Sequence, residues 1–243
     1  MKLLQWNIWY QEDIKNVVAL LRDINPDIIC LQELTIGHPE FNKGIDTPKF
    51  IAEELGFHFY FKEAHDDPEN IFGSGIFSRY PIVKNSFSLI REPKGTYDTH
   101  QHFSDQGRVY IECDIDIDGK LITVGTTHMS YTDGFSPDHE KDAEADNLVK
   151  ILSTKKENYV FAGDLNALPD SYTISEVSKI LKNAGPSFEE STWTTKPFNY
   201  NGFVADKLKW RLDYCFTTPD VKVDSARIVD TEYSDHLPIL IEI

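Results

Sequence analysis

Two strand–helix–strand units occur along this chain, and they restrict the folds open to it more than any other feature. Hydrophobic periodicity predicts strands at 2–10 and 27–33 around an amphipathic helix at 12–24. The same order returns in the second half, with strands at 120–127 and 158–163 around a helix at 137–152. Residues 27–33 are almost wholly apolar, as expected for a strand that is covered on both faces. Each half of the chain therefore contains a crossover unit.

The remaining predicted elements are mostly strands. Helices are predicted at 47–55 and 172–182, and further strands at 57–62, 75–78, 82–90, 108–117, 208–217, 221–229 and 237–243. Asp118-Gly119 is a strong hairpin signal between two of these strands. Strands that outnumber helices, in a mixture of hairpins and crossovers, indicate an α/β (α+β) fold. We expect a four-layer sandwich of two packed mixed β-sheets flanked by helices, formed by residues 1–243 as a single domain.

The charge of the chain restricts its partners. Asp and Glu number 40 against 24 Lys and Arg, a formal net charge of −16. Such a surface repels a polyanion at long range, unless a local basic patch or a bound metal cation reverses the sign at one cleft. A surface adapted for solubility explains the acidity equally well. The charge therefore counts only weakly against nucleic acid as a partner.

Cysteine usage and hydropathy bear on the location of the protein. Cys30, Cys113 and Cys215 each lie in an apolar, strand-like run, and an odd number completes no disulfide framework. We expect all three to be reduced core residues. The opening MKLLQWNIWY turns polar too early for a signal peptide, and no apolar run approaches membrane-spanning length. A cytoplasmic monomer that does not insert into membranes is expected.

Polar residues stand at or inside the ends of apolar strands. They are Asn7, Glu33, His128, Asp164, Asn166, Asp213, Asp235 and His236. In the stretch FAGDLNALPDS, strand alternation predicts that Asp164 and Asn166 face one side and Leu165 the other. Burying an unpaired carboxylate is costly, so these groups must pair with one another, with cations or with a ligand. One shared site built from carboxylate and amide oxygens suits Mg²⁺, with Mn²⁺ able to substitute.

Each of these residues also has a local explanation when it is taken alone. The explanations are a bulge or turn at Asn7, a loop start or cap at Glu33, a core histidine at His128, an Asx-turn at Asp164, pairing with Arg211 at Asp213 and a cap at Asp235. All of them would have to hold independently. A single site for metal-assisted hydrolysis of a phosphoester is the simpler interpretation.

Seven short motifs resemble the endonuclease/exonuclease/phosphatase superfamily in their order and approximate spacing. They are WNIW, LQE, GRVY, TTH, GDLN, RLDY and SDH, and they extend from Asn7 to His236. The superfamily includes pancreatic deoxyribonuclease, abasic-site endonucleases, tyrosyl-DNA phosphodiesterases, deadenylases, inositol-polyphosphate phosphatases and neutral sphingomyelinases. The combination of GDLN with a downstream SDH is specific, whereas either motif alone is weak.

The resemblance implies a metal site. Glu33 is similar to the family's main Mg²⁺ ligand, and Asn7 and Asp235 match residues that complete the surroundings of the metal directly or through water. Arg108 matches an arginine that is structural or lies at the rim of the site in relatives. We therefore expect a divalent cation near the first of these residues.

The resemblance also implies catalytic roles. Asp164 matches the residue that orients or deprotonates the attacking water, and Asn166 the one that holds this water or a phosphate oxygen. His236 resembles the histidine that contacts the scissile phosphate or acts as general base, with Asp213 behind it fixing its tautomer. His128 matches a position that is histidine in nucleases of the pancreatic type and in many phosphatases, and tyrosine in abasic-site enzymes.

The substrate stays open at this stage. A nuclease or DNA-end phosphodiesterase, acting on DNA or RNA, requires basic and aromatic residues around the cleft. KLKWR at 207–211 with Trp193, Phe198, Tyr200 and Phe203 offers such a patch, unless these residues form a strand edge with core aromatics. No long insertion resembles an abasic-site recognition loop, which counts against an abasic endonuclease.

Two other functions compete with a nuclease. A phosphatase or phosphodiesterase of a small-molecule or lipid-headgroup substrate agrees with the acidic surface. His100 and His102 in YDTHQHF would then line the pocket, unless they are ordinary loop residues. A non-catalytic binding module on the same fold is the third alternative. The presence of every expected catalytic residue argues against it.

Overall fold

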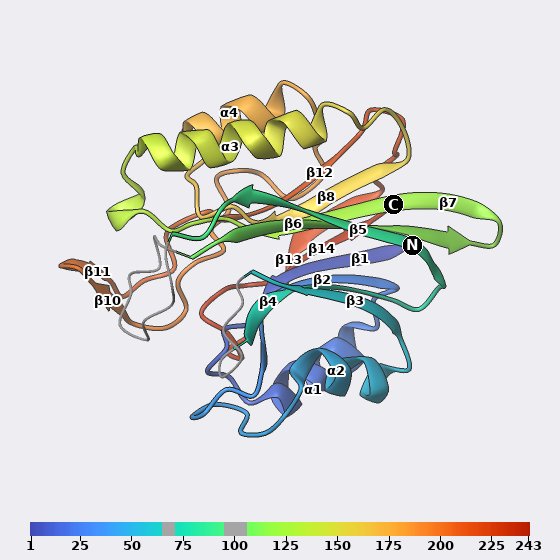
Figure 1. Ribbon diagram of the computed structural model, residues 1–243, viewed down its shortest axis with the longest axis horizontal. Coiled ribbons are helices and arrows are strands. Elements are labelled where there is room, and N and C mark those ends of the chain that lie inside the picture. Colours follow the sequence, from blue (N-terminus) through green and yellow to red (C-terminus); the bar gives the residue numbers. More distant parts are fainter. Residues whose placement is uncertain (65–70, 95–105) are drawn as a thin grey trace.

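Two β-sheets packed face to face form the centre of the computed structural model, which describes residues 1–64, 71–94 and 106–243. Helices α1 and α2 cover the outer face of one sheet, and α3 and α4 cover the outer face of the other (Figure 1). This confirms the predicted four-layer sandwich. Within the described ranges, no helix is both long and apolar enough to cross a membrane.

The first sheet has six strands in the order β13-β14-β1-β2-β4-β3. Its strands are β1 (Lys2–Asn7), β2 (Ile28–Ile36), β3 (His58–Glu63), β4 (Ile71–Ser78), β13 (Ser225–Ile228) and β14 (Ile239–Glu242). Helix α1 (Ile14–Ile24) connects the parallel pair β1 and β2, and α2 (Thr47–Leu55) follows β2. All other pairs in this sheet are antiparallel.

The second sheet has six strands in the order β5-β6-β7-β8-β12-β9. Its strands are β5 (Ile82–Arg91), β6 (Arg108–Ile117), β7 (Lys120–His128), β8 (Tyr159–Asp164), β9 (Lys182–Asn183) and β12 (Asp213–Thr217). Helix α3 (His139–Leu152) connects the parallel pair β7 and β8, and α4 (Tyr172–Ser178) follows β8. A 3₁₀ turn, η2 (Asp133–Phe135), and a separate hairpin of β10 (Phe198–Tyr200) and β11 (Phe203–Ala205) lie beyond the sheet.

Three apolar layers hold the four layers together. Residues such as Leu3, Ile28, Ile111 and Val160 pack between the sheets, and separate clusters fill the spaces under α1 and α2 and under α3 and α4. Cys30, Cys113 and Cys215 are fully buried in the central layer as free thiols, as predicted. This leaves polar chemistry to the ends of the strands.

Several predicted elements in the second half are too long. The strands predicted at 221–229 and 237–243 shorten to β13 (Ser225–Ile228) and β14 (Ile239–Glu242). The helix predicted at 172–182 ends at Ser178, and 182–183 forms β9 instead. The strand predicted at 208–217 begins only at Asp213. The preceding residues form a loop because Arg211 is buried and donates hydrogen bonds to the main-chain oxygens of Ser187 and Glu190.

The segment predicted to be irregular at 194–207 contains the hairpin β10–β11. Asn201 and Gly202 form its turn, with φ of 48° and 81°. Positive φ at both central residues is what a type I′ hairpin turn requires, and Asn-Gly is its usual sequence. The sequence therefore contained this signal, and the prediction overlooked it.

Candidate active site

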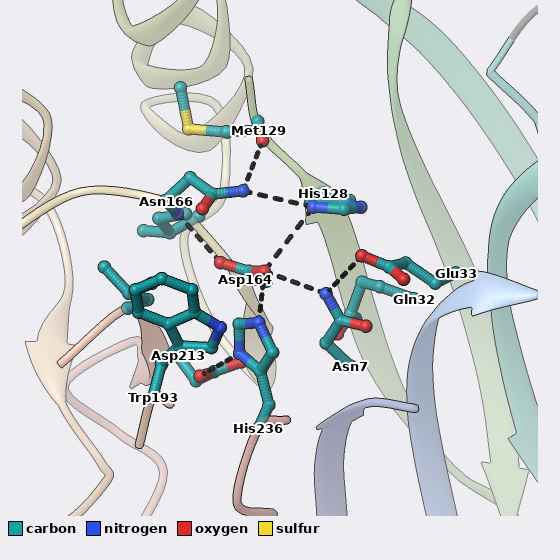
Figure 2. A network of polar contacts seen from close by, with 12 residues as sticks. Asn7, Gln32, Glu33, His128, Met129, Asp164, Asn166, Trp193, Asp213 and His236 are labelled. Atoms are coloured by element: carbon teal, nitrogen blue, oxygen red, sulfur yellow. Dashed lines mark hydrogen bonds and ion pairs between the residues drawn. The ribbon is translucent and has the colours of Figure 1, made fainter. Parts of the chain in front are cut away.

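The strands of both sheets bring polar residues to one edge of the sandwich. β1 ends at Asn7, β7 at His128 and β8 at Asp164. Because β1 runs parallel to β2 and β7 runs parallel to β8, the carboxyl ends of each pair lie at the same edge. β12 runs the other way and begins at Asp213, directly opposite Asp164. Side chains far apart in the sequence therefore meet at this edge (Figure 2).

Gly163 allows β7 and β8 to approach closely just before this edge. A Cβ atom at Gly163 would lie 2.4 Å from the main-chain oxygen of Thr127. No side chain can occupy that space without moving the neighbouring strand. The glycine of the GDLN motif is therefore needed for the pairing that places Asp164 opposite His128.

Glu33 reaches the site through a β-bulge. The pairing of β2 with β4 shifts between Leu31 and Leu34, and Glu33 has a φ of 60°. A bulge with positive φ redirects a side chain and is often found beside functional sites. The Glu33 carboxylate accepts hydrogen bonds from Asn7 Nδ2 at 3.0 Å and from the backbone nitrogen of Tyr10 at 3.1 Å. The bulge thus turns an acidic side chain of a buried strand into the cleft.

Asn7 links the acidic groups of the two sheets. Its Nδ2 atom also donates to Asp164 Oδ2 at 3.0 Å, while its Oδ1 atom accepts from the backbone nitrogen of Trp9 at 3.1 Å. The amide nitrogen of Asn7 therefore faces both carboxylates in this structure. One asparagine holds Glu33 and Asp164 close together.

His236 lies between two aspartates. Its Nδ1 atom is 2.9 Å from Asp213 Oδ2, and its Nε2 atom is 3.7 Å from Asp164 Oδ2. Burial alone lowers the pKa of His236, but the charges of Asp213, Asp164 and Asp235 outweigh burial and raise this pKa well above its ordinary value. His236 is therefore a buried cation at neutral pH.

Two carboxyl groups at the site, Asp164 and Glu33, have raised pKa values. Burial raises the pKa of Asp164 to about 7, while His236 lowers it and Asp213 raises it further. Burial also raises the pKa of Glu33, with the charge of Asp235 adding to the effect. The negative charge gathered here exceeds the nearby positive charge. This imbalance is relieved by protons or by a bound cation.

His128 and Asn166 complete the side of the site next to α3. His128 Nε2 is 3.1 Å from Asn166 Nδ2 and 3.4 Å from Asp164 Oδ2. Burial and the charges of Arg108, His236 and Lys141 lower the pKa of His128 well below its ordinary value, so its imidazole is neutral. A neutral imidazole in this position can donate a hydrogen bond to a ligand or accept one from it.

The predicted alternation through GDLN is wrong in its geometry. β8 ends at Asp164, and Asn166 has a φ of 44°, outside the strand. The backbone nitrogen of Asn166 donates to Asp164 Oδ1 at 2.9 Å, so a tight turn brings the amide back to the same spot. Leu165 is fully buried in the core under α3 and α4, as predicted. The local Asx-turn explanation and the shared site therefore both hold.

Asp235 and Arg108 lie at the border of the site. Asp235 Oδ2 accepts a hydrogen bond from Trp193 Nε1 at 3.0 Å. Arg108 is buried, lines the cleft and donates from Nε to Ser130 Oγ at 3.2 Å. Arg211 binds the main-chain oxygen of Asp213 and not its carboxylate, so the expected side-chain pairing is absent from the described residues.

Two sets of residues compete as candidates for holding a metal. Asp164, Asp213 and His236 have ligand atoms within 4.8 Å of one another. In that set, however, His236 Nδ1 and Asp213 Oδ2 already lie 2.9 Å apart in contact with each other. Glu33 and Asp235, which border the cleft as carboxylates, fit a divalent cation better.

Sequence analysis missed several buried polar residues that support the site. Gln5 is fully buried between the sheets and donates to Asp213 Oδ1 at 3.0 Å and to Gln32 Oε1 at 2.8 Å. Lys141 of α3 donates at 2.6 Å to the main-chain oxygens of Ser130 and Leu165, just after His128 and Asp164. The only sign of Gln5 and Lys141 in the sequence is that a polar residue stands where the pattern of the strand or helix predicts a buried one.

Comparisons with known proteins establish the family of the chain. The model of the endonuclease/exonuclease/phosphatase family matches residues 4–236, nearly the whole chain. The chain belongs to this family. The resemblance noted in the sequence motifs is thereby confirmed, and the site described above lies within the matched segment.

Individual relatives of this family member are distant in sequence. A DNA-(apurinic or apyrimidinic site) endonuclease from Dictyostelium discoideum is 24% identical and covers 98% of this chain and 69% of the relative. A humanised D. rerio TDP2 superposes with a TM-score of 0.70 at 18% identity, covering 99% of this chain and 97% of the other. A Bacteroides thetaiotaomicron mannosyl-6-phosphatase reaches a TM-score of 0.71 at 15% identity, covering 100% and 98%. These structures share the fold of this family member.

Proposed function

We propose that this member of a phosphoester-hydrolase family is an Mg²⁺-dependent phosphodiesterase, with Mn²⁺ able to substitute. A nuclease or a DNA-end phosphodiesterase is the preferred function. The observation that carries the proposal is the position of Asp164, fully buried between cationic His236 and the Asn7–Glu33 pair. We also propose a single domain over residues 1–243, a monomer and a cytoplasmic location.

The donor set fits the divalent ion. Glu33 and Asp235 are hard oxygen donors. Burial raises the pKa of Glu33 and of Asp164, and a neighbouring carboxylate, Asp235 or Asp213, raises each further. Glu33 and Asp235, with Asn7 next to them, would hold the ion. When it is bound, it supplies positive charge that stabilises the phosphate as negative charge accumulates on it.

Side chains of the protein carry out proton transfers and hold the phosphate during hydrolysis. Asp164 accepts a proton from the water whose oxygen attacks phosphorus. The bond from phosphorus to the leaving oxygen breaks, and this oxygen takes up a proton from solvent and departs as an alcohol. His236 donates its Nε2 proton to a phosphate oxygen, and Asp213 keeps the other ring nitrogen protonated. Asn166 and neutral His128 hold the water or a second phosphate oxygen from the opposite side.

Different relatives support different substrates. An abasic-site endonuclease among the sequence relatives and TDP2 among the structural neighbours support a DNA substrate. The mannosyl-6-phosphatase among the structural neighbours and the net charge of −16 support the alternative, a small-molecule or lipid-headgroup phosphoester. A binding module without activity, the third alternative, has no use for a buried aspartate beside a cationic histidine.

A substrate panel tests the proposal. With Mg²⁺, rates are compared on single-stranded DNA, abasic duplex, phosphotyrosyl DNA, inositol phosphates, sphingomyelin and an aryl phosphodiester. We expect a DNA substrate to give the highest kcat/KM, and chelator to abolish the activity. Turnover confined to inositol phosphates or sphingomyelin would establish the headgroup alternative. Binding without any turnover, unchanged by chelator, would establish the binding module.

Metal binding should depend on pH in a way that unfolding experiments can detect. The pKa of Asp164 rises from 3.8 to about 7 on folding, so in this range the folded metal-free chain holds more protons than the unfolded chain. Stability of the metal-free protein then falls as the pH rises through this window, and the raised pKa of His236 acts in the same direction at higher pH. The pKa of Glu33 is raised too, so Mg²⁺ bound there competes with the proton of that carboxyl and, through its charge, disfavours protons on the neighbouring groups. We expect Mg²⁺ to raise the Tm more at pH 8 than at pH 5.

The control for this measurement is NaCl at equal ionic strength, which should give no such difference. An equal Mg²⁺-induced rise in Tm at both pH values would show that the ion binds away from these carboxylates.

Gln5 should act as a positioning residue. It belongs to a buried chain of hydrogen bonds that continues from Gln32 Nε2 to Thr126 Oγ1 at 2.9 Å and so crosses from one sheet to the other. Gln5→Leu removes the donor that orients Asp213, and through it His236. We expect kcat to fall about tenfold, with KM within about twofold, since one buried hydrogen bond to a charged group contributes on the order of 1.5–3 kcal/mol. Gln5→Asn should restore part of kcat, which would not be expected if Gln5 only filled space. An unchanged kcat in Gln5→Leu would exclude the positioning role.

A further inference from the structure

Two groups of aromatic side chains border the cleft into which the site opens. The cleft has a volume of about 680 Å³. The first group, here called the Tyr10 cluster, consists of Tyr10, His38, Phe41 and Phe72. The second, here called the Tyr200 cluster, consists of Tyr131, Phe198 and Tyr200. No residue of either group takes part in the chemistry proposed above.

The Tyr10 cluster is attached to the metal side of the site. The backbone nitrogen of Tyr10 donates to Glu33 Oε2 at 3.1 Å. Its ring centroid lies 5.0 Å from that of Phe72 and 5.5 Å from that of His38. All three of these rings line the cleft, and those of Tyr10 and Phe72 are half-buried. The Tyr10 ring, packed edge-to-face against Phe72, thus lies next to the carboxylate that we assign to the metal.

The Tyr200 cluster is attached to the histidine side through Trp193. The Trp193 indole donates to Asp235, and its ring centroid lies 6.2 Å from that of His236 and 5.0 Å from that of Phe198. Phe198 is 5.7 Å from Tyr131, which is 6.1 Å from Tyr200. All of these rings line the cleft, and the three rings of the cluster are half-buried.

The two clusters therefore flank the position of the reacting phosphate. Trp193 and Glu33, their points of attachment, lie on opposite sides of Asp164 and His236 (Figure 2). A phosphodiester whose phosphorus is attacked at Asp164 would extend one substituent toward each cluster. Aromatic rings hold planar groups by stacking, and a base stacked on a ring contributes about 1–3 kcal/mol.

The charges around the cleft argue against a duplex. Histidines aside, the cations that line it within the described residues are Arg108 and Lys196. An adjoining pocket, which shares Tyr131 and Tyr200 with the cleft, is lined by Arg91, which forms an ion pair with Glu140, and by three acidic residues, Asp133, Asp138 and Glu140. Duplex binding depends on neutralising several phosphates of each strand, which these surroundings do not provide.

The sequence-based patch around KLKWR does not supply that charge either. Arg211 is buried, and Trp193, Phe203 and Trp210 pack together with Leu212 in a small core. The alternative interpretation, core aromatics beside a short backbone pairing, is therefore correct for this part of the patch. Trp193, Phe198 and Tyr200 are the members that line the cleft. His100 and His102 lie outside the described residues.

We propose that the cleft accepts a phosphodiester flanked by two unpaired bases, one stacked on each aromatic cluster. Such a group occurs in a single-stranded oligonucleotide and in a free dinucleotide, and a base-paired strand does not present it. The inference rests on the proposed phosphodiesterase function and selects one substrate class for the same site.

Dinucleotides with one phosphodiester test the role of each base. TpT is compared with two analogues in which the 5′ or the 3′ nucleoside is an abasic tetrahydrofuran residue. We expect each removed base to raise KM about tenfold with kcat within about threefold, as expected from the loss of one stacked base. Single-stranded dT12 should exceed the dT12·dA12 duplex in kcat/KM by about a hundredfold, which corresponds to two lost stacking contacts. If dT12 is cleaved and TpT is not, the substrate is the oligonucleotide rather than the dinucleotide.

Variants link each base to one cluster. Tyr200→Ala and Tyr10→Leu should each raise KM for TpT about tenfold and leave KM unchanged for the analogue that lacks the matching base. Tyr172→Ala is the matched control, because Tyr172 is an exposed aromatic residue on α4 outside the cleft lining. Equal KM values for TpT and its abasic analogues, or an equal effect of the variants on both, would overturn the proposal.

Binding to a variant without turnover separates this inference from the proposed function. Calorimetry with the Asp164→Asn protein should give a Kd for TpT about tenfold lower than for either analogue. If the three Kd values are equal while an aryl phosphodiester is hydrolysed by the unsubstituted protein, the phosphodiesterase function stands and the two-base substrate is wrong. If the Kd values depend on the bases but no phosphodiester is hydrolysed, the two-base site stands and the phosphodiesterase function is wrong.

Discussion

Replacing Asp164 by asparagine is expected to lower kcat about a thousandfold, with little change in KM. Asparagine preserves the shape of the side chain and the acceptor for the backbone nitrogen of Asn166. It cannot accept the proton of the attacking water, and proton transfer by a positioned group typically contributes a factor of about 10²–10⁴. Single-turnover rates with saturating Mg²⁺ on the best substrate of the panel would measure the loss.

The same segment provides a matched control. Asp170 lies six residues downstream in the GDLNALPDS stretch and is exposed. Asp170→Asn carries the same chemical change and should leave kcat within about twofold, as surface substitutions do. Thermal unfolding should show that Asp164→Asn is folded, since the change removes a buried carboxylate whose pKa is raised. A kcat within tenfold of the unsubstituted protein would mean that Asp164 is not the proton acceptor.

Glu33→Gln has the second largest expected effect, and it acts on the metal. Glutamine keeps an acceptor for Asn7 and for the backbone of Tyr10, but it removes one negative charge from the donor set. We expect the Mg²⁺ concentration for half-maximal rate to rise about a hundredfold, since hard divalent cations bind through carboxylate charge. Part of the lost rate should return at high Mg²⁺, which a defect in folding or proton transfer would not allow.

The measurement has a readout that is independent of activity. The Mg²⁺-induced rise in Tm at pH 8 should disappear in Glu33→Gln at ion concentrations that saturate the unsubstituted protein. Glu40→Gln, at an exposed position beside the cleft-lining His38, is the control and should retain the rise. An unchanged half-maximal concentration together with an unchanged Tm rise would place the metal elsewhere, with the Asp164–Asp213–His236 group as the next candidate.

Strand patterns predicted the fold well because its layers are built from apolar alternation and crossover helices. α2 (Thr47–Leu55) and β6 (Arg108–Ile117) have the predicted boundaries. Errors occurred where tertiary contacts override local pattern. Residues 208–212 alternate apolar and basic side chains as a strand would, but Arg211 holds them in a loop by binding distant backbone oxygens. Local periodicity contains no information about such long-range partners.

For the site, sequence could name candidates but could not supply their geometry. The order of motifs pointed to Asn7, Glu33, Asp164 and His236, and the structure brings them into one group, joined by two hydrogen bonds and an ion pair. The sequence did not predict that Glu33 reaches the site through a bulge, because the bulge depends on the register between β2 and β4. The sequence did not identify Gln5 either, since the role of this buried glutamine is explained only by its hydrogen bond to Asp213 on the other sheet.

By itself, the sequence determined the four-layer architecture and the family, because periodicity and short motifs are local properties that need no coordinates. The tertiary structure alone decided the protonation of the site and the shape of its cleft. A pKa depends on burial and on charges that arrive from other strands, as the positions of Asp213 and Asp164 around His236 demonstrate. The aromatic clusters likewise join segments distant in sequence, so their position on either side of the reacting phosphate exists only in the folded chain.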